Sequence, residues 1–286
     1  MTFSTNGKYL LSSSDHGIQV WKMKNGLVVA TMKLQSAAYC LAYSQDGSWI
    51  AAGTQRGDVV VWSAETYKHV FSYREDHKGI NAVDISPDAA RLVSASENCI
   101  VSVFDVATRQ RLLLLRHDSP VVAAKYSPDG DRLLTATQSS VRVYDNINHY
   151  FIADIHISVT PGYNNGLLWS NDHILVLSGS NIVQIDASTG STLSEWPAYS
   201  NNQYSCIGLP KHGGFIASST ERTVALWDMS THTQLSLIRY PQDIRSISVS
   251  PDDQFIAIGG PDGKIIVESL SLMNVSTVDC RTTYGF

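Results

Sequence analysis

A short turn motif recurs seven times along the 286-residue chain, and its spacing limits the possible folds more strongly than any other feature. Most copies place Ser two positions before Asp or Asn, and several of them end in Gly. Asp bonds to its own backbone in a turn, and Gly adopts the positive φ that other residues resist. The copies begin 40 to 43 residues apart, at Ser4, Ser44, Ser86, Ser127, Ser170, Pro210 and Ser250. This spacing predicts seven similar units of about 41 residues each.

A second mark follows each turn by about 17 residues. It is a run of alternating apolar and polar residues that ends in a large apolar residue, and in most copies Asp or Glu follows directly. The closing residues are 40 to 42 positions apart, at Trp21, Trp62, Phe104, Tyr144, Ile185, Trp227 and Val267. Two independent markers with one period establish the repeat.

The pattern inside one repeat is entirely that of β-strands. From Val121 the chain contains four runs of five to eight residues, rich in β-branched and aromatic side chains and separated by turn residues. Only 16% of the residues are charged, which fits short strands better than charged surface helices. One such four-stranded sheet cannot bury both faces alone, whereas seven in a ring can. The sequence therefore predicts an all-β fold, a seven-bladed β-propeller of four-stranded antiparallel blades.

The repeat arithmetic also predicts the blade boundaries within a single domain, 1–286. The innermost strand of the first blade is expected to be split between the two ends of the chain, or the chain is a segment of a longer array. These two interpretations stay open. The expected blades are 1–34 with 281–286, 35–74, 75–116, 117–157, 158–199, 200–240 and 241–280.

The period, the four strands per repeat and the Trp-Asp pair at residues 227–228 resemble the WD-repeat β-propeller family. That resemblance implies a buried hydrogen-bonded set of His, Ser or Thr, Asp and Trp in each blade. His77 and His117 match the His position, and Asp15 with Ser13 matches part of the set before Trp21. No repeat shows all four members, so packing and strand pairing are expected to supply most of the stability.

The sequence carries no motif that predicts catalysis. It has no nucleophile elbow, no phosphate-binding loop and no zinc spacing, so we expect no enzyme activity, no cofactor, no catalytic residue and no metal. The glycine-rich run 259–263 is interpreted as a turn between two strands. Four widely spaced cysteines favour a reducing, cytoplasmic location. The net charge of −5 and the lack of a long apolar run favour neither a nucleic-acid partner nor a membrane.

The candidate partner-binding residues lie on one face of the ring. Loops that join the fourth strand of one blade to the first strand of the next share this face with the loops between strands two and three. In the WD-repeat family this face commonly receives partners, and arginine and tyrosine are frequent anchors of interfaces. The candidates are Tyr39, Arg56, Arg74, Arg116, Tyr163, Tyr199, Tyr204, Arg222, Arg239, Tyr240 and Arg245.

These observations favour a non-catalytic scaffold that binds a protein or peptide on its loop-rich face. It would act as a monomer, or as part of a larger chain or complex, such as the recognition module of a signalling protein. The alternative is a propeller enzyme or small-ligand binder that uses the central channel. Such a site would require several acidic residues or histidines whose side chains meet near the inner strands.

Overall fold

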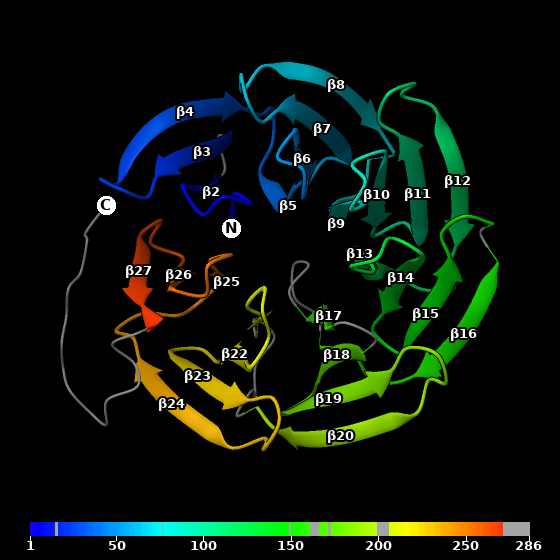
Figure 1. Ribbon diagram of the computed structural model, residues 1–286. Coiled ribbons are helices and arrows are strands. Elements are labelled where there is room, and N and C mark those ends of the chain that lie inside the picture. Colours follow the sequence, from blue (N-terminus) through cyan, green and yellow to red (C-terminus); the bar gives the residue numbers. More distant parts are fainter. Residues whose placement is uncertain are drawn as a thin grey trace.

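The computed structural model describes residues 1–14, 17–75, 77–148, 150–160, 166–170, 173–198 and 206–270. Every regular element of more than one residue in this part of the chain is a β-strand, and the strands form seven antiparallel sheets arranged in a ring (Figure 1). The predicted fold is confirmed: the chain is a seven-bladed β-propeller.

Within each blade the strands follow chain order from the centre of the ring to its outside. The first three blades contain β1 (Thr2–Phe3), β2 (Tyr9–Ser14), β3 (Gly17–Lys22) and β4 (Leu27–Lys33); β5 (Ala38–Tyr43), β6 (Trp49–Thr54), β7 (Asp58–Ser63) and β8 (His69–Arg74); and β9 (Ile80–Ile85), β10 (Arg91–Ser96), β11 (Ile100–Asp105) and β12 (Arg111–Arg116).

The remaining four blades repeat this arrangement. They contain β13 (Val121–Tyr126), β14 (Arg132–Thr137), β15 (Ser140–Asp145) and β16 (Phe151–His156); β17 (Leu167–Ser170), β18 (His173–Ser178), β19 (Asn181–Asp186) and β20 (Thr192–Pro197); β21 (Ile207–Gly208), β22 (Phe215–Ser219), β23 (Thr223–Asp228) and β24 (Gln234–Arg239); and β25 (Ser246–Val249), β26 (Phe255–Gly259) and β27 (Ile265–Ser269).

The ring meets itself between the seventh and the first blade. Strand β1 occupies the innermost position of the first blade, where Thr2 pairs with Leu11 and Phe3 with Leu10. The seventh blade has three described strands, and the rest of its predicted range lies outside the described residues. The tail 281–286, which was expected beside β1, also lies outside them.

The repeated turn has the chemistry that its sequence predicts. In four copies the buried Ser hydroxyl donates a hydrogen bond of 2.5 to 2.6 Å to the Asp two positions later. The hydrogen bond from Ser86 holds the pKa of Asp88 below its ordinary value, and Ser127 does the same for Asp129. Each turn thus fixes the start of the second strand in its blade.

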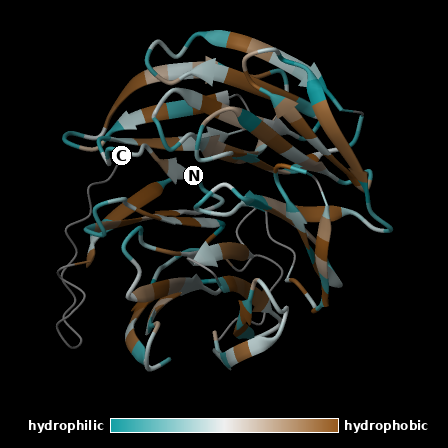
Figure 2. Ribbon diagram, turned by 45° about the vertical axis from the view of Figure 1, so that its right-hand side comes forward, coloured by the Kyte–Doolittle hydropathy of each residue, from teal (hydrophilic) through white to brown (hydrophobic). Residues whose placement is uncertain are grey.

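The hydrophobic core is distributed between neighbouring blades. Apolar residues run along the strands, while the turns are mostly hydrophilic (Figure 2). Between the second and third blades, the ring of Tyr73 stacks on Phe104 with 3.7 Å between centroids. Trp196 of the fifth blade stacks on His232 of the sixth at 4.2 Å. Each blade thus buries its faces against its neighbours.

Two blades keep the Trp–Ser part of the family's hydrogen-bonded set. The indole nitrogen of Trp21 donates to the Ser12 hydroxyl at 2.8 Å, and that of Trp227 donates to Ser218 at 2.8 Å. The acceptor in the first blade is therefore Ser12 and not Ser13, which the sequence had suggested. Asp15 lies outside the described residues.

We expect Ser218→Ala to lower the free energy of unfolding by about 1–2 kcal/mol, because it removes the acceptor of a buried indole nitrogen. Both Trp227 and Ser218 are almost fully buried. Ser12→Ala is the matched control, since Trp21 is only half-buried and water can replace the lost acceptor. Urea unfolding of both variants measures the difference, and an equal or larger loss for Ser12→Ala would contradict this explanation.

Candidate partner-binding face

One end of the ring collects the loops that the sequence singled out. The described loops of this end include the turns at 55–57, 97–99 and 220–222 between second and third strands. They also include the connections at 34–37, 117–120 and 240–245 between blades. Because antiparallel strands alternate in direction, these two kinds of loop lie at the same end of every blade. We call this end the loop face.

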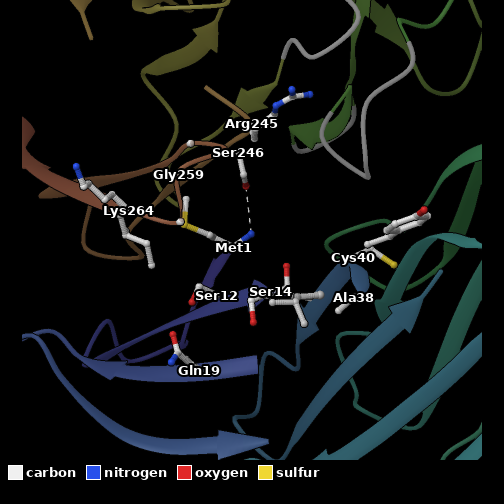
Figure 3. Close-up of a pocket in the computed structure, with 16 residues that line it drawn as sticks. Met1, Ser12, Ser14, Gln19, Ala38, Cys40, Arg245, Ser246, Gly259 and Lys264 are labelled. Atoms are coloured by element: carbon white, nitrogen blue, oxygen red, sulfur yellow. Dashed lines mark hydrogen bonds between the residues drawn. The ribbon is translucent and has the colours of Figure 1, made fainter. Parts of the chain in front are cut away.

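A cavity of about 280 Å³ lies at the loop face between blades seven, one and two. Strands β2, β3, β5, β25, β26 and β27 supply its walls, and Figure 3 shows Met1 between Ser246 and Gly259 of the seventh blade and Ser12 and Ser14 of the first. The backbone nitrogen of Met1 donates to the Ser246 hydroxyl at 3.1 Å. The lining residues are Met1, Ser12, Ser13, Ser14, Gln19, Ala38, Tyr39, Cys40, Leu41, Arg245, Ser246, Gly259, Gly260, Gly263, Lys264 and Ile265.

Two glycines allow the chain to pass close to this cavity. A Cβ atom on Gly259 would lie 2.9 Å from the Met1 Cε atom, and one on Gly260 would lie 2.9 Å from the carbonyl oxygen of Asp243. Side chains at these positions would therefore push the cavity wall inward. The run 259–263 connects β26 to β27, as the sequence predicted, and it also forms one side of the cavity.

The polar groups of the cavity are hydroxyls, an amide and cations. Ser13 and Gln19 present side-chain donors, while the Ser14 hydroxyl donates to the carbonyl oxygen of Gly17 at 3.2 Å. Arg245 and Lys264 carry positive charge at the exposed edge. Lys264 also contacts Asp262 at 3.5 Å. The described lining contains no carboxylate and no histidine. Such a set of donors suits an acidic side chain.

The thiol of Cys40 does not provide a nucleophile in this cavity. Burial raises the pKa of Cys40 to about 12, so the thiol stays protonated at neutral pH. Its Sγ atom lies 3.4 Å from the carbonyl oxygen of Ile80. Within the described residues, no three His, Cys, Asp or Glu side chains are grouped so that they could hold a metal ion. The cavity is therefore equipped for binding through hydrogen bonds and charge.

Two of the predicted arginines are engaged by neighbouring carboxylates. Arg74 forms a two-pronged ion pair with Asp58, at 2.7 and 3.0 Å, where the last residue of β8 lies opposite the first residue of β7. Arg222 contacts Asp243 at 3.1 Å across two loops. These guanidinium groups are exposed, but a partner would have to compete with an existing acid.

The other predicted arginines are placed differently. Arg56 is exposed in the turn between β6 and β7, while Arg116 and Arg239 are exposed at the ends of β12 and β24. Arg245 is also exposed and lies at the cavity edge. The structure therefore distributes these arginines around the ring and brings only Arg245 to the cavity.

The predicted tyrosines do not form a shared exposed surface in the described structure. Tyr39 is half-buried on β5 and lines the cavity, with its ring close to Gly79. Tyr240 was expected on the loop face, but its side chain is only 8% exposed and packs in a hydrophobic cluster with Ile244 and Ile258. Tyr163, Tyr199 and Tyr204 lie outside the described residues.

His117 is the buried member of a polar cluster at the start of the fourth blade. Its Nδ1 atom lies 3.5 Å from Arg142, and Arg142 in turn contacts Asp154 at 3.0 Å and Asp118 at 3.3 Å. The backbone nitrogen of His117 donates to the carbonyl oxygen of Cys99 at 2.8 Å. Burial, followed by the charge of Arg142, lowers the pKa of His117 to about 4. This histidine is neutral at physiological pH and holds the loop in place.

Comparison with known proteins places these features in a family. The model described as "WD domain, G-beta repeat" matches residues 1–22, 28–63, 67–105, 109–145 and 233–267, which is more than half of the chain. The chain belongs to this WD-repeat family. A Periodic tryptophan protein 2 homolog from Caenorhabditis elegans is 24% identical over 277 residues, covering 93% of the WD-repeat chain and 30% of the relative.

Two solved structures share the propeller. The structure titled Kuenenia stuttgartiensis Hydrazine Synthase has a TM-score of 0.82 at 14% identity and covers 94% of each chain. A chain of the Crystal Structure of Mitotic Checkpoint Complex has a TM-score of 0.82 at 17% identity, covering 94% of this WD-repeat chain and 88% of that one. At these identities the similarity concerns the fold alone. The WD-repeat chain spans less than half the length of the first curated relatives it matches.

The cavity was not predicted from the sequence. Its walls come from the beginning and the end of the described chain and from the second blade, so no local sequence motif predicts it. The one available signal was the glycine-rich run 259–263, whose sequence pattern predicts only a turn.

In the described part of the chain, no helix has the length and apolar character needed to cross a membrane.

Proposed function

We propose that this WD-repeat chain is a non-catalytic interaction scaffold that binds a segment of a partner protein on its loop face. The cavity between blades seven, one and two would accept an acidic side chain of that segment. The observation that carries the proposal is the cavity itself, because its hydroxyls and two cations converge on the loop face without a described carboxylate among them.

Several findings support a protein partner. Membership of the WD-repeat family and a structural match to a chain in a mitotic checkpoint complex both favour assembly with other proteins. The described lining of the cavity contains no carboxylate and no histidine, which favours binding over catalysis. An intracellular location belongs to the same proposal, and the free thiols of Cys40, Cys99 and Cys206 support it.

The test compares the proteins that the chain retains before and after reversal of the cavity charges. Arg245→Glu with Lys264→Glu is expected to reduce retention of specific partners by about tenfold, because it replaces attraction for an acidic side chain by repulsion. The control is Lys68→Glu with Lys211→Glu, two exposed lysines in the turns at the opposite end of the ring. Quantitative mass spectrometry of the captured proteins gives the ratio.

Circular dichroism first establishes that both double variants fold. Partners retained by the wild type and by the control, but lost from the cavity variant, would support the proposal. Equal retention by all three proteins would show that this cavity is not the binding site.

A further inference from the structure

The first blade has a different charge from the rest of the protein. It contains Lys8, Lys22, Lys24 and Lys33, and its only acidic residue is Asp15. Each of the other six blades has at least two acidic residues, and the whole chain has a net charge of −5. Asp15 lies outside the described residues. The first blade is therefore a basic segment in an acidic protein.

None of these four lysines forms an ion pair within the described part of the chain, although all four are exposed. Lysines elsewhere do find acids: Lys125 contacts Asp84 at 3.4 Å and Lys264 contacts Asp262 at 3.5 Å. On the side of the seventh blade, a Cβ atom on Gly7 would lie 4.0 Å from one carboxylate oxygen of Asp252, whose other oxygen accepts a hydrogen bond from Ser250. Asp252 is therefore near the first blade, but it forms no ion pair with these lysines in the described structure.

Three of the lysines lie at one corner of the blade. The backbone nitrogen of Met23 donates to the carbonyl oxygen of Lys8 at 2.9 Å, which joins the turn after β1 to the turn after β3. Lys22 pairs in register with Tyr9 on one side and with Leu27 on the other. Lys24 follows in the turn between β3 and β4. We call this surface the lysine corner: Lys8, Lys22 and Lys24.

Apolar side chains adjoin the lysine corner on the outermost strand. Leu27, Val28 and Val29 begin β4 and are 61%, 41% and 46% exposed. Strand β4 lies at the outside of the ring, and in the described structure it pairs with β3 alone (Figure 1). Among the described residues none pairs with its second edge, and such an edge can receive another extended chain.

We propose that β4 and the lysine corner form a second docking surface, which binds an extended segment of a partner protein that alternates acidic and apolar residues. Paired residues of neighbouring strands point to the same face, so the acidic side chains would lie on the face of Lys22 and Leu27, next to the lysine corner, and the apolar ones on the opposite face beside Val28. The open strand edge favours a polypeptide over an anionic membrane, because a bilayer offers no backbone groups to pair with β4. This surface is separate from the loop face and does not depend on the function proposed for it.

The probe is a short fluorescent peptide of alternating Glu and Val, titrated with the whole chain and followed by fluorescence anisotropy. The charge-reversal variant Lys22→Glu with Lys24→Glu is expected to weaken binding about tenfold, and Val28→Ser to weaken it severalfold. The control Lys78→Glu with Lys211→Glu changes two exposed lysines of the third and sixth blades and is expected to stay within twofold of the wild type. A peptide with Gln in place of Glu should bind at least tenfold more weakly.

Several outcomes would overturn the proposal. Absence of peptide binding would do so, as would equal weakening by the two charge-reversal variants. Binding of phosphatidylserine vesicles or of single-stranded RNA through Lys22 and Lys24, without binding of the peptide, would assign the surface to another class of partner. Self-association that disappears in the Lys22→Glu, Lys24→Glu variant, again without peptide binding, would assign it to a second copy of the chain. Arg245→Glu with Lys264→Glu should leave peptide binding intact, which separates this test from that of the loop face.

Discussion

Replacing Gly53 with Ala is expected to lower the free energy of unfolding by about 3 kcal/mol, because the added methyl group has no space. A Cβ atom at this position would lie 2.4 Å from Ile80 Cγ2 and 2.6 Å from Cys40 Sγ. Ile80 is fully buried at the start of the third blade. The substitution would therefore force the second and third blades apart where their inner strands meet.

Ala52, the residue before Gly53, stands where the first and sixth blades have the Ser that accepts a hydrogen bond from Trp. Ile50 pairs with Trp62 two residues before it, as Leu10 pairs with Trp21 and Ile216 pairs with Trp227 two residues before Ser12 and Ser218. Gly53 lies on the opposite face of the strand from Ala52, so a change of Gly53 to Ser would not provide an acceptor for Trp62. It is expected to destabilise the protein at least as much as Ala, because Ile80 leaves no space for a side chain at this position.

Gly208→Ala is the matched control, since Gly208 is a buried glycine on an inner strand of the sixth blade. There a Cβ atom would meet its nearest neighbour, Val249, at 3.5 Å, which is an ordinary contact. Chemical denaturation of both variants should show a large loss for Gly53→Ala and a change within about 1 kcal/mol for Gly208→Ala. Similar losses in both proteins would show that steric conflict with Ile80 is not the cause.

The sequence predicted the strands and the ring well because their causes are local and repeated. A turn such as 127–130 needs only its own Ser, Asp and Gly, and Ser127 does bond to Asp129 at 2.5 Å. A strand such as β15 needs only alternating side chains. Because these local features occur in seven copies, the period can be recognised even where the motif of one copy is degenerate.

The candidate site was harder to predict because it depends on contacts between repeats. Counting positions placed Tyr240 on a loop, where it lies, but its side chain packs in the core between blades six and seven. Counting also gave Arg74 as a binding candidate without its ion-pair partner Asp58, which antiparallel register sets opposite it. The pairing of Arg74 with Asp58 could have been predicted from the sequence, because the last residue of a fourth strand faces the first residue of the third. The packing of Tyr240 and the cavity were not available, because their neighbours are far apart in the chain.

Acidification is expected to destabilise the protein through His117 before the turn carboxylates are protonated. The pKa of His117 is lowered to about 4 in the folded chain by burial and by Arg142, whereas an unfolded histidine titrates near 6.5. Between these two values the unfolded chain binds more protons than the folded one. The stability contributed by the neutral ring is therefore complete above about pH 6.5 and is lost as the pH falls toward 4. The loss amounts to about 2–3 kcal/mol.

The replacement His117→Gln should flatten this part of the pH profile, because glutamine does not titrate. His69→Gln, which changes an exposed histidine on β8, is the control and should keep the wild-type slope. The free energy of unfolding, measured in urea at intervals from pH 7 to pH 4, gives both slopes. A wild-type slope that persists in His117→Gln would mean that another group takes up the proton. In that case the cluster with Arg142, Asp118 and Asp154 would have a purely geometric role in fixing the connection between blades three and four.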